Sequence, residues 1–130
     1  MAELTNYDAN LIQGAMVASG PVAYATWTPF VALFSTAPDA TGAGTECTDA
    51  TYARKAVPYG APGATTRQCA NNAIITFAAF TGSFTVHYLA IFDAVSGGNM
   101  RRFGTTDINV AVGAGVQPTF AIGALTDTLT

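Results

Sequence analysis

The spacing of the hydrophobic residues changes after Pro21, from a helical period to a period of two. Before Pro21, apolar residues recur at intervals of three and four, which predicts one amphipathic helix over about residues 5–18. Thr5 followed by Asp8 resembles a capping box at its start, and Gly20 before Pro21 would end it. The apolar face of this helix comprises Leu4, Tyr7, Leu11, Ile12, Ala15 and Met16.

Beyond Pro21 the chain has the pattern of short strands between turns rich in glycine and proline. Residues 28–35 alternate with apolar side chains on both faces, which predicts a strand that is covered on both sides. Pro58 places residues 52–59 at a strand end or a sheet edge, because proline cannot donate to a ladder. Further strands are expected over residues 72–77, 83–93, 100–104, 108–112, 116–125 and 125–129, with a tight hairpin turn at Ser96-Gly97-Gly98-Asn99.

These patterns predict a mainly β fold, an antiparallel sandwich or barrel of the jelly-roll type with one N-terminal helix. A parallel α/β fold would need helices between the strands, and the pattern contains none. The length fits one domain over residues 1–130, with the strands between about 28 and 129.

Charged residues make up only 10% of the chain, against roughly 25% in an average soluble domain. A surface of Thr, Ala, Ser, Gly and Asn costs little to desolvate, which favours permanent contact with another protein. Basic residues cluster only as the pairs Arg54-Lys55 and Arg101-Arg102, too few to neutralise phosphates, so no nucleic-acid partner is expected. Adjacent Arg101 and Arg102 are expected on opposite faces of one strand, with at most one of them buried, and that one paired.

The sequence predicts neither a membrane partner nor a cofactor. No run approaches the roughly 18 apolar residues of a membrane span, and the N-terminus lacks a secretion signal. Cys47 and Cys69 stand alone and His87 is the sole histidine, so no metal site is expected. The two cysteines could form a disulfide, but a cytoplasmic origin favours free thiols.

Catalytic residues are likewise not expected, and the chain is predicted not to be an enzyme. His87 is expected to point outward or into an interface. Asp93 and Asp107 flank the hairpin and are expected to bind local amides rather than to face each other. Asp39, Glu46 and Asp49 share one loop without the spacing of a dedicated calcium site.

The residues expected at a protein interface lie in three places. Tyr7 and Leu11 lie on the predicted helix, and Tyr24 and Trp27 follow it in an irregular stretch. Tyr52 and Arg54 lie on a strand that is poor in charge. Arg54 is expected to anchor either a subunit interface or a loop carboxylate such as Glu46, and Arg54→Ala to weaken assembly.

One series of segments resembles a known group of proteins. Phe30-Val31-Ala32-Leu33-Phe34-Ser35 is followed by a Gly-Thr loop, Thr45-Glu46, Tyr52-Ala53-Arg54, and the hairpin Ile91-Phe92-Asp93…Ser96-Gly97-Gly98-Asn99. This order is similar to small virion proteins of tailed bacteriophages, of the capsid decoration or tail-fibre type. The likeness covers roughly residues 28–130 and includes the helix that opens with Leu4-Thr5-Asn6-Tyr7.

The resemblance implies a structural virion protein that is made in the host cytoplasm. We expect a capsid decoration (cement) protein, a homotrimer on the capsid surface whose N-terminal helix, or the arm that flanks it, contacts the major capsid protein. The alternative is a host-recognition module of the tail fibre or baseplate that binds cell-surface glycan through aromatic loops.

Overall fold

The computed structural model describes residues 2–17 and 26–128, and it is mainly β with one helix, as the sequence predicts. The helix α1 spans Asn6–Val17; Gly20 and Pro21, expected to end it, lie outside the described residues. The strands are β1 (Ala2–Leu4), β2 (Phe30–Phe34), β3 (Lys55–Ala56), β4 (Gln68–Ala70), β5 (Ile75–Thr76), β6 (Phe84–Val86), β7 (Tyr88–Phe92), β8 (Met100–Gly104), β9 (Val110–Val112), β10 (Thr119–Phe120) and β11 (Thr126–Thr128). In the part of the chain that is described, no helix is both long and apolar enough to cross a membrane.

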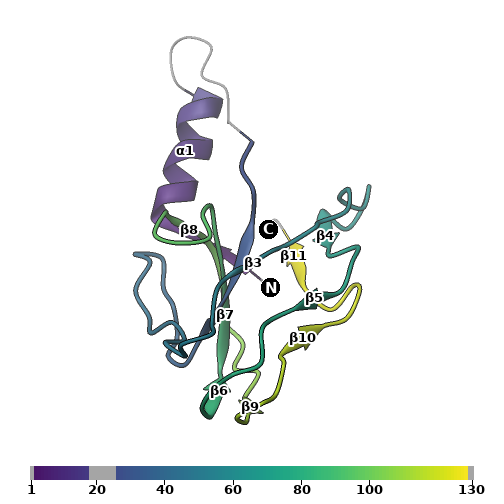
Figure 1. Ribbon diagram of the computed structural model, residues 1–130. Helices are drawn as coiled ribbons and strands as arrows, with labels where there is room; N and C mark the ends of the chain where they lie inside the picture. The colour runs from purple at the N-terminus through teal and green to yellow at the C-terminus, as the bar shows by residue number, and fades with distance from the viewer. Residues whose placement is uncertain (1, 18–25, 129–130) are drawn as a thin grey trace.

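A five-stranded antiparallel sheet in the order β1-β8-β7-β2-β3 forms the centre of the molecule (Figure 1). The strand β2 is buried on both faces, as predicted, with Val31 and Leu33 in one apolar cluster and Ala32 and Phe34 in another. The short strand β3 is an edge of this sheet, which fits the nearby Pro58.

The second half of the chain is one long antiparallel hairpin, a feature that the sequence did not reveal. Four ladders follow one another along it, pairing β4 with β11, β5 with β10, β6 with β9 and β7 with β8. The tip is the predicted turn, where Gly97 and Gly98 adopt φ of 61° and 68°. The ladder nearest the tip, β7 with β8, belongs to the five-stranded sheet. The remainder, residues 68–86 with 110–128, we call the ribbon; it lies beside the sheet (Figure 1).

The chain changes sides where it passes from the ribbon into the sheet. The strand expected over residues 83–93 is two strands, broken at His87, whose N–H donates to the Phe34 carbonyl at 2.9 Å. Unbroken alternation over residues 83–93 would place Phe84, Val86, Tyr88, Ala90 and Phe92 on one face, and the break prevents this. Phe84 and Val86 lie in the first cluster, whereas Tyr88, Ala90 and Phe92 lie in the second.

The first cluster is the main core and lies between the sheet and the ribbon. Its buried members are Val31, Leu33, Cys47, Val57, Ile75, Phe77, Phe80, Val86, Ile91, Val112 and Leu125. The second cluster, on the opposite face of the sheet, includes Phe34, Phe92, Met100 and Phe103. The jelly-roll detail of the prediction is not confirmed, because the described strands form one five-stranded sheet and three two-stranded ladders.

The ribbon ladders are shorter than expected because a side chain replaces backbone pairing between them. Asn71 is 1% exposed, and its Nδ2 donates to the carbonyls of Ala73 and Ala121, each at 2.9 Å. Its Oδ1 accepts from the Leu125 N–H at 2.9 Å. These bonds satisfy backbone groups in a stretch where the two strands separate, so the strands predicted over 72–77 and 116–125 shrink to β5 and β10.

A buried carboxylate fastens α1 to the sheet. Thr5 caps the helix as predicted, since its Oγ1 accepts from the Asp8 N–H at 3.3 Å. Asp8 does not complete the capping box. Its side chain is 0% exposed and pairs with Nε of Arg101 at 2.6 Å and with Nη1 of Arg102.

Both arginines turn to the same carboxylate, which corrects the expectation that they point to opposite faces. Ile91 pairs with Arg102 and Phe92 pairs with Met100, so Arg101 is an extra residue that forms a β-bulge. A bulge breaks the alternation of side chains, and neighbours no longer diverge. The side chains of Arg101 and Arg102 are only 5% and 14% exposed, and both are paired.

Candidate assembly surfaces

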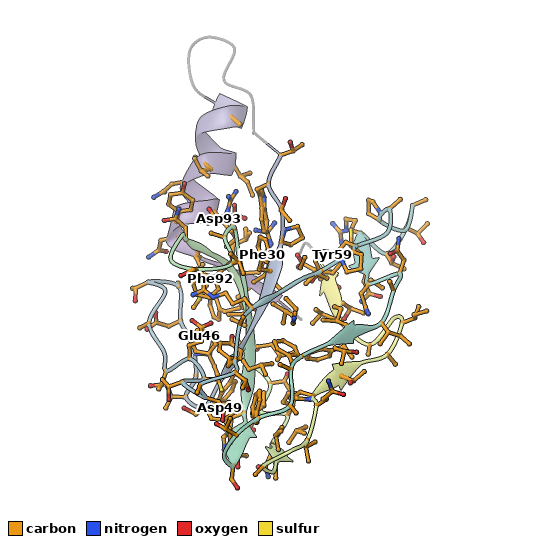
Figure 2. All side chains as sticks on the ribbon, viewed as in Figure 1. Phe30, Glu46, Asp49, Tyr59, Phe92 and Asp93 are labelled. Carbon is orange, nitrogen blue, oxygen red and sulfur yellow. The ribbon has the colours of Figure 1, made fainter. Side chains whose placement is uncertain are left out.

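Arg54 is turned into the molecule and clamps two loops together. Its Nε and Nη2 each donate to a Glu46 carboxylate oxygen at 2.8 Å, which confirms the expected pairing. Its Nη1 donates to the carbonyls of Ala94 and Gly97 at 3.1 and 2.7 Å, and the guanidinium carbon lies 3.5 Å from the centre of the Phe92 ring. Figure 2 shows Glu46 and Phe92 near each other. The Arg54 side chain is only 9% exposed.

Tyr52 likewise makes contacts within the chain. Its hydroxyl donates to Glu46 Oε1 at 2.7 Å and accepts from the Leu33 N–H at 3.1 Å. Its ring stacks on Phe77 with centroids 6.0 Å apart. Tyr52 and Arg54 therefore hold the loop that carries Glu46 against the sheet.

The other interface candidates lie around the helix. Tyr7 and Leu11 are 44% and 41% exposed on α1. Trp27 is half-buried, and the Arg101 guanidinium carbon lies 4.5 Å from its ring centre and 5.4 Å from that of Tyr7. Tyr24 lies outside the described residues. The structure thus gathers Tyr7 and Trp27 around Arg101 and places Tyr52 and Arg54 in a separate cluster.

Asp93 and Asp107 each bind a nearby backbone N–H and do not share a partner. Asp93 accepts from the Asn99 N–H at 2.7 Å, whereas Asp107 accepts from the Asn109 N–H at 2.9 Å and pairs with His87 Nδ1 at 2.9 Å. The described residues include no group of three or more His, Cys, Asp or Glu able to hold a metal ion. Cys47 and Cys69 are free thiols, as expected, and burial raises the pKa of Cys47.

Hydrogen bonds favour the charged form of the Glu46 and Asp49 carboxylates. Burial alone would raise the pKa of Glu46, but hydrogen bonds from Arg54 and Tyr52 outweigh it and lower the pKa below 4.5. Asp49 (Figure 2) accepts backbone N–H bonds from Thr51, Thr81 and Gly82, and these lower its pKa. The bonds from Thr81 and Gly82 tie the loop of Asp49 to the segment that precedes β6.

The lowered pKa of Glu46 predicts a loss of stability in acid. A group with a lower pKa in the folded state stabilises the fold above its unfolded pKa, here 4.5, and this contribution disappears as the pH falls through the folded value. We expect urea midpoints to fall as the pH is lowered below 4.5. Glu46→Gln lacks this titration, so its midpoint should depend less on pH over the same range; an equal dependence would contradict the assignment.

A surface that the sequence reasoning missed lies on the ribbon. Along β5 and β10 inward side chains alternate with exposed ones, and the exposed ones form what we call the ribbon face. It comprises Ile74, Thr76 and Ala78 on one strand and Gln117, Thr119 and Ala121 on the other, with Ile122 in the turn beyond. Ile74 and Ile122 are 63% and 64% exposed. The signal in the sequence was the absence of any Asp, Glu, Lys or Arg from residues 68–92 and 108–126.

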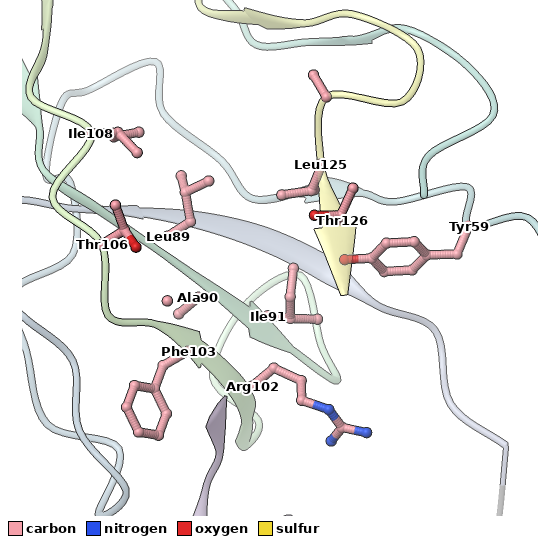
Figure 3. A pocket seen from close by; sticks show the side chains of 12 residues that line it. Tyr59, Leu89, Ala90, Ile91, Arg102, Phe103, Thr106, Ile108, Leu125 and Thr126 are labelled. Atoms are coloured by element: carbon pink, nitrogen blue, oxygen red, sulfur yellow. The ribbon is translucent and has the colours of Figure 1, made fainter. Parts of the chain in front are cut away.

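An apolar groove of about 150 Å³ opens between the sheet and β11 (Figure 3). Leu89 and Ile91 from β7 line one side, and Leu125 and Thr126 line the other. The ring of Tyr59 also lines it, and the Tyr59 hydroxyl is buried without a hydrogen-bond partner among the described residues. Burial raises the pKa of Tyr59.

Removing this hydroxyl should not weaken the fold. A buried polar atom that lacks a partner costs about 1–3 kcal/mol, so we expect Tyr59→Phe to be neutral or to stabilise by about 1 kcal/mol. Urea unfolding of the two proteins measures the difference. Tyr52→Phe is the matched control, because it removes a hydroxyl that has two partners and should destabilise. Equal losses in both variants would contradict the assignment.

Comparison with known proteins identifies the family. A family model described as Podophage GP4 fiber I protein gp80 matches residues 3–128. The chain belongs to this family. No curated protein matches the sequence.

Membership in the gp80 family makes the chain a structural protein of the phage virion, which confirms the resemblance seen in the sequence. The match includes α1, the Arg54 clamp and the ribbon, so all three belong to the region that the gp80 family shares. A structural subunit acts through its contacts with neighbouring proteins, so its surface is the part of the molecule that bears on function.

Proposed function

We propose that this protein is a structural subunit of the fibre apparatus of a podophage virion, held there by permanent contacts with neighbouring subunits. The family description names a fibre protein, which favours the tail-fibre alternative over capsid decoration. Glycan binding by the isolated protein, a part of that alternative, stays a prediction that a glycan array tests.

One observation carries the proposal, namely that most charged side chains form hydrogen bonds or ion pairs within the chain. Asp8, Arg101 and Arg102 form one network, and Arg54 with Glu46 forms another. Among the charged residues in the described part of the chain, only Glu3, Lys55 and Arg67 have a side chain that forms no hydrogen bond or ion pair.

The surface that remains is neutral and partly apolar. Large apolar side chains are exposed on the helix, at Tyr7 and Leu11, and on the ribbon, at Ile74 and Ile122. A neutral surface loses little hydration on contact, and exposed apolar groups gain by burial, so it suits lasting assembly. We assign the helix surface, with Tyr7, Leu11 and Trp27, to contact with a different virion protein. The major capsid protein, which was expected from the sequence, is one candidate for this partner.

Gold-labelled antibody against the protein, applied to purified virions, tests the location. Label at the tail supports a fibre subunit, and label over the capsid would instead support the decoration role. Virions without label, although the protein is produced during infection, would overturn the proposal. Leu11→Asp should reduce incorporation into virions if the helix surface is a contact, whereas Lys55→Asp, at a side chain without a partner, should not.

A further inference from the structure

We infer that the ribbon face binds the ribbon face of a second copy of this chain. The inference rests on the proposed structural role, because only an assembling subunit has reason to keep such a surface. It names the surface through which copies of the chain meet, which neither the family description nor the sequence reasoning supplies.

The charge distribution selects the occupant. The ribbon face lies within residues 68–92 and 108–126, which contain no Asp, Glu, Lys or Arg. A partner that brought a charge onto this surface would have to bury it without a counter-ion, which is costly. The complementary surface is therefore one without charge, and every copy of the chain carries such a surface.

The geometry of the ladder makes the surface regular enough to pair with itself. Thr76 lies directly opposite Thr119 in β5 and β10, and Ile75 lies opposite Phe120 on the inner side. The inner side chains Ile75 and Phe77 are 4% and 1% exposed and fix the ladder on the first cluster. The outer side chains are mostly small or β-branched, so few rotamers are lost when they are covered.

The apolar residues of the face are concentrated at one end. The ladder ends at Ile75 and Phe120, and just beyond it Asn71 Nδ2 donates to the carbonyls of Ala73 and Ala121, so Ile74 and Ile122 both lie near that end. These two isoleucines, each more than 60% exposed, are the largest apolar side chains of the face. An isologous contact, in which both copies use the same surface, would cover Ile74 and Ile122 in both copies at once.

Sedimentation velocity of the purified chain over a range of concentrations tests the inference. We expect the native protein to self-associate and Ile122→Asp to weaken the association at least tenfold. Val95→Asp is the matched control, because Val95 is also exposed (53%) but lies at the hairpin tip, away from the ribbon. Circular dichroism shows whether each variant is folded, and since Ile122 lies in a turn, its substitution should leave the ladder intact.

Charge complementation identifies the partner surface. Ile74→Asp and Ile74→Lys should each fail to associate alone, because like charges would face each other, and an equal mixture should associate again. A mixture that stays monomeric would overturn the pairing of ribbon with ribbon, as would a native protein that is monomeric at every concentration. If the protein is monomeric but the antibody still labels the fibre of virions, this inference alone is overturned. If the protein self-associates but is absent from virions, only the proposed function is overturned.

Discussion

Asp8→Ala is expected to lower the free energy of unfolding by about 3–5 kcal/mol, because it leaves two guanidinium groups without their shared counter-ion. Asp8 is 0% exposed and contacts both Arg101 and Arg102. Near the midpoint a loss of this size corresponds to roughly 10–20 °C in Tm for a domain of this length. Urea unfolding and thermal melts measure it, and loss of helical circular dichroism would show that α1 detaches.

Two further variants test whether the lost charge of Asp8 causes the effect. Asp8→Asn retains the shape of the side chain but removes its charge, so it should still destabilise strongly. Asp39→Ala is the control, because Asp39 is exposed and binds only its own turn through Thr41 and Ala43, and it should cost much less. If Asp8→Ala unfolded at the same urea concentration as the native protein, the buried network would not anchor the helix.

Arg54→Ala is expected to cost about 2–4 kcal/mol, since it removes hydrogen bonds to a carboxylate and leaves Glu46 half-buried and unpaired. Arg54→Lys keeps the charge but cannot donate two parallel bonds, so its loss should be intermediate. Lys55→Ala, the neighbouring control without a partner among the described residues, should change stability by no more than about 0.5 kcal/mol. Urea unfolding of the three variants provides the comparison.

Arg54→Ala also distinguishes between two roles for Arg54, a contact between subunits and a contact within one chain. The sequence suggested that its loss would weaken assembly, whereas the structure shows contacts within one chain. Sedimentation of Arg54→Ala under conditions in which it remains folded tells them apart. Lost association with unchanged stability would favour the interface role, and lost stability with normal association would favour the internal clamp.

Patterns within short stretches of sequence predicted the elements well. The helix, the turn at Gly97 and Gly98, and the strand β8 were placed correctly, and β2 was correctly expected to be covered on both sides. Each depends on local rules: side-chain periodicity, the conformational freedom of glycine, and the short reach of a capping side chain. The scarcity of charge, a property of composition alone, also favoured a protein that assembles with others.

The sequence did not determine which distant segments pair or which side chains meet. Alternation gives each strand two faces but no partner, so the continuous hairpin over residues 68–128 could not be read from it. The break at His87 and the bulge at Arg101 each reverse the alternation, and both arise from hydrogen bonds between residues far apart in the chain. Only the tertiary structure therefore turned Arg54 inward, brought two arginines to Asp8 and left Ile74 and Ile122 on the outer face of the ribbon.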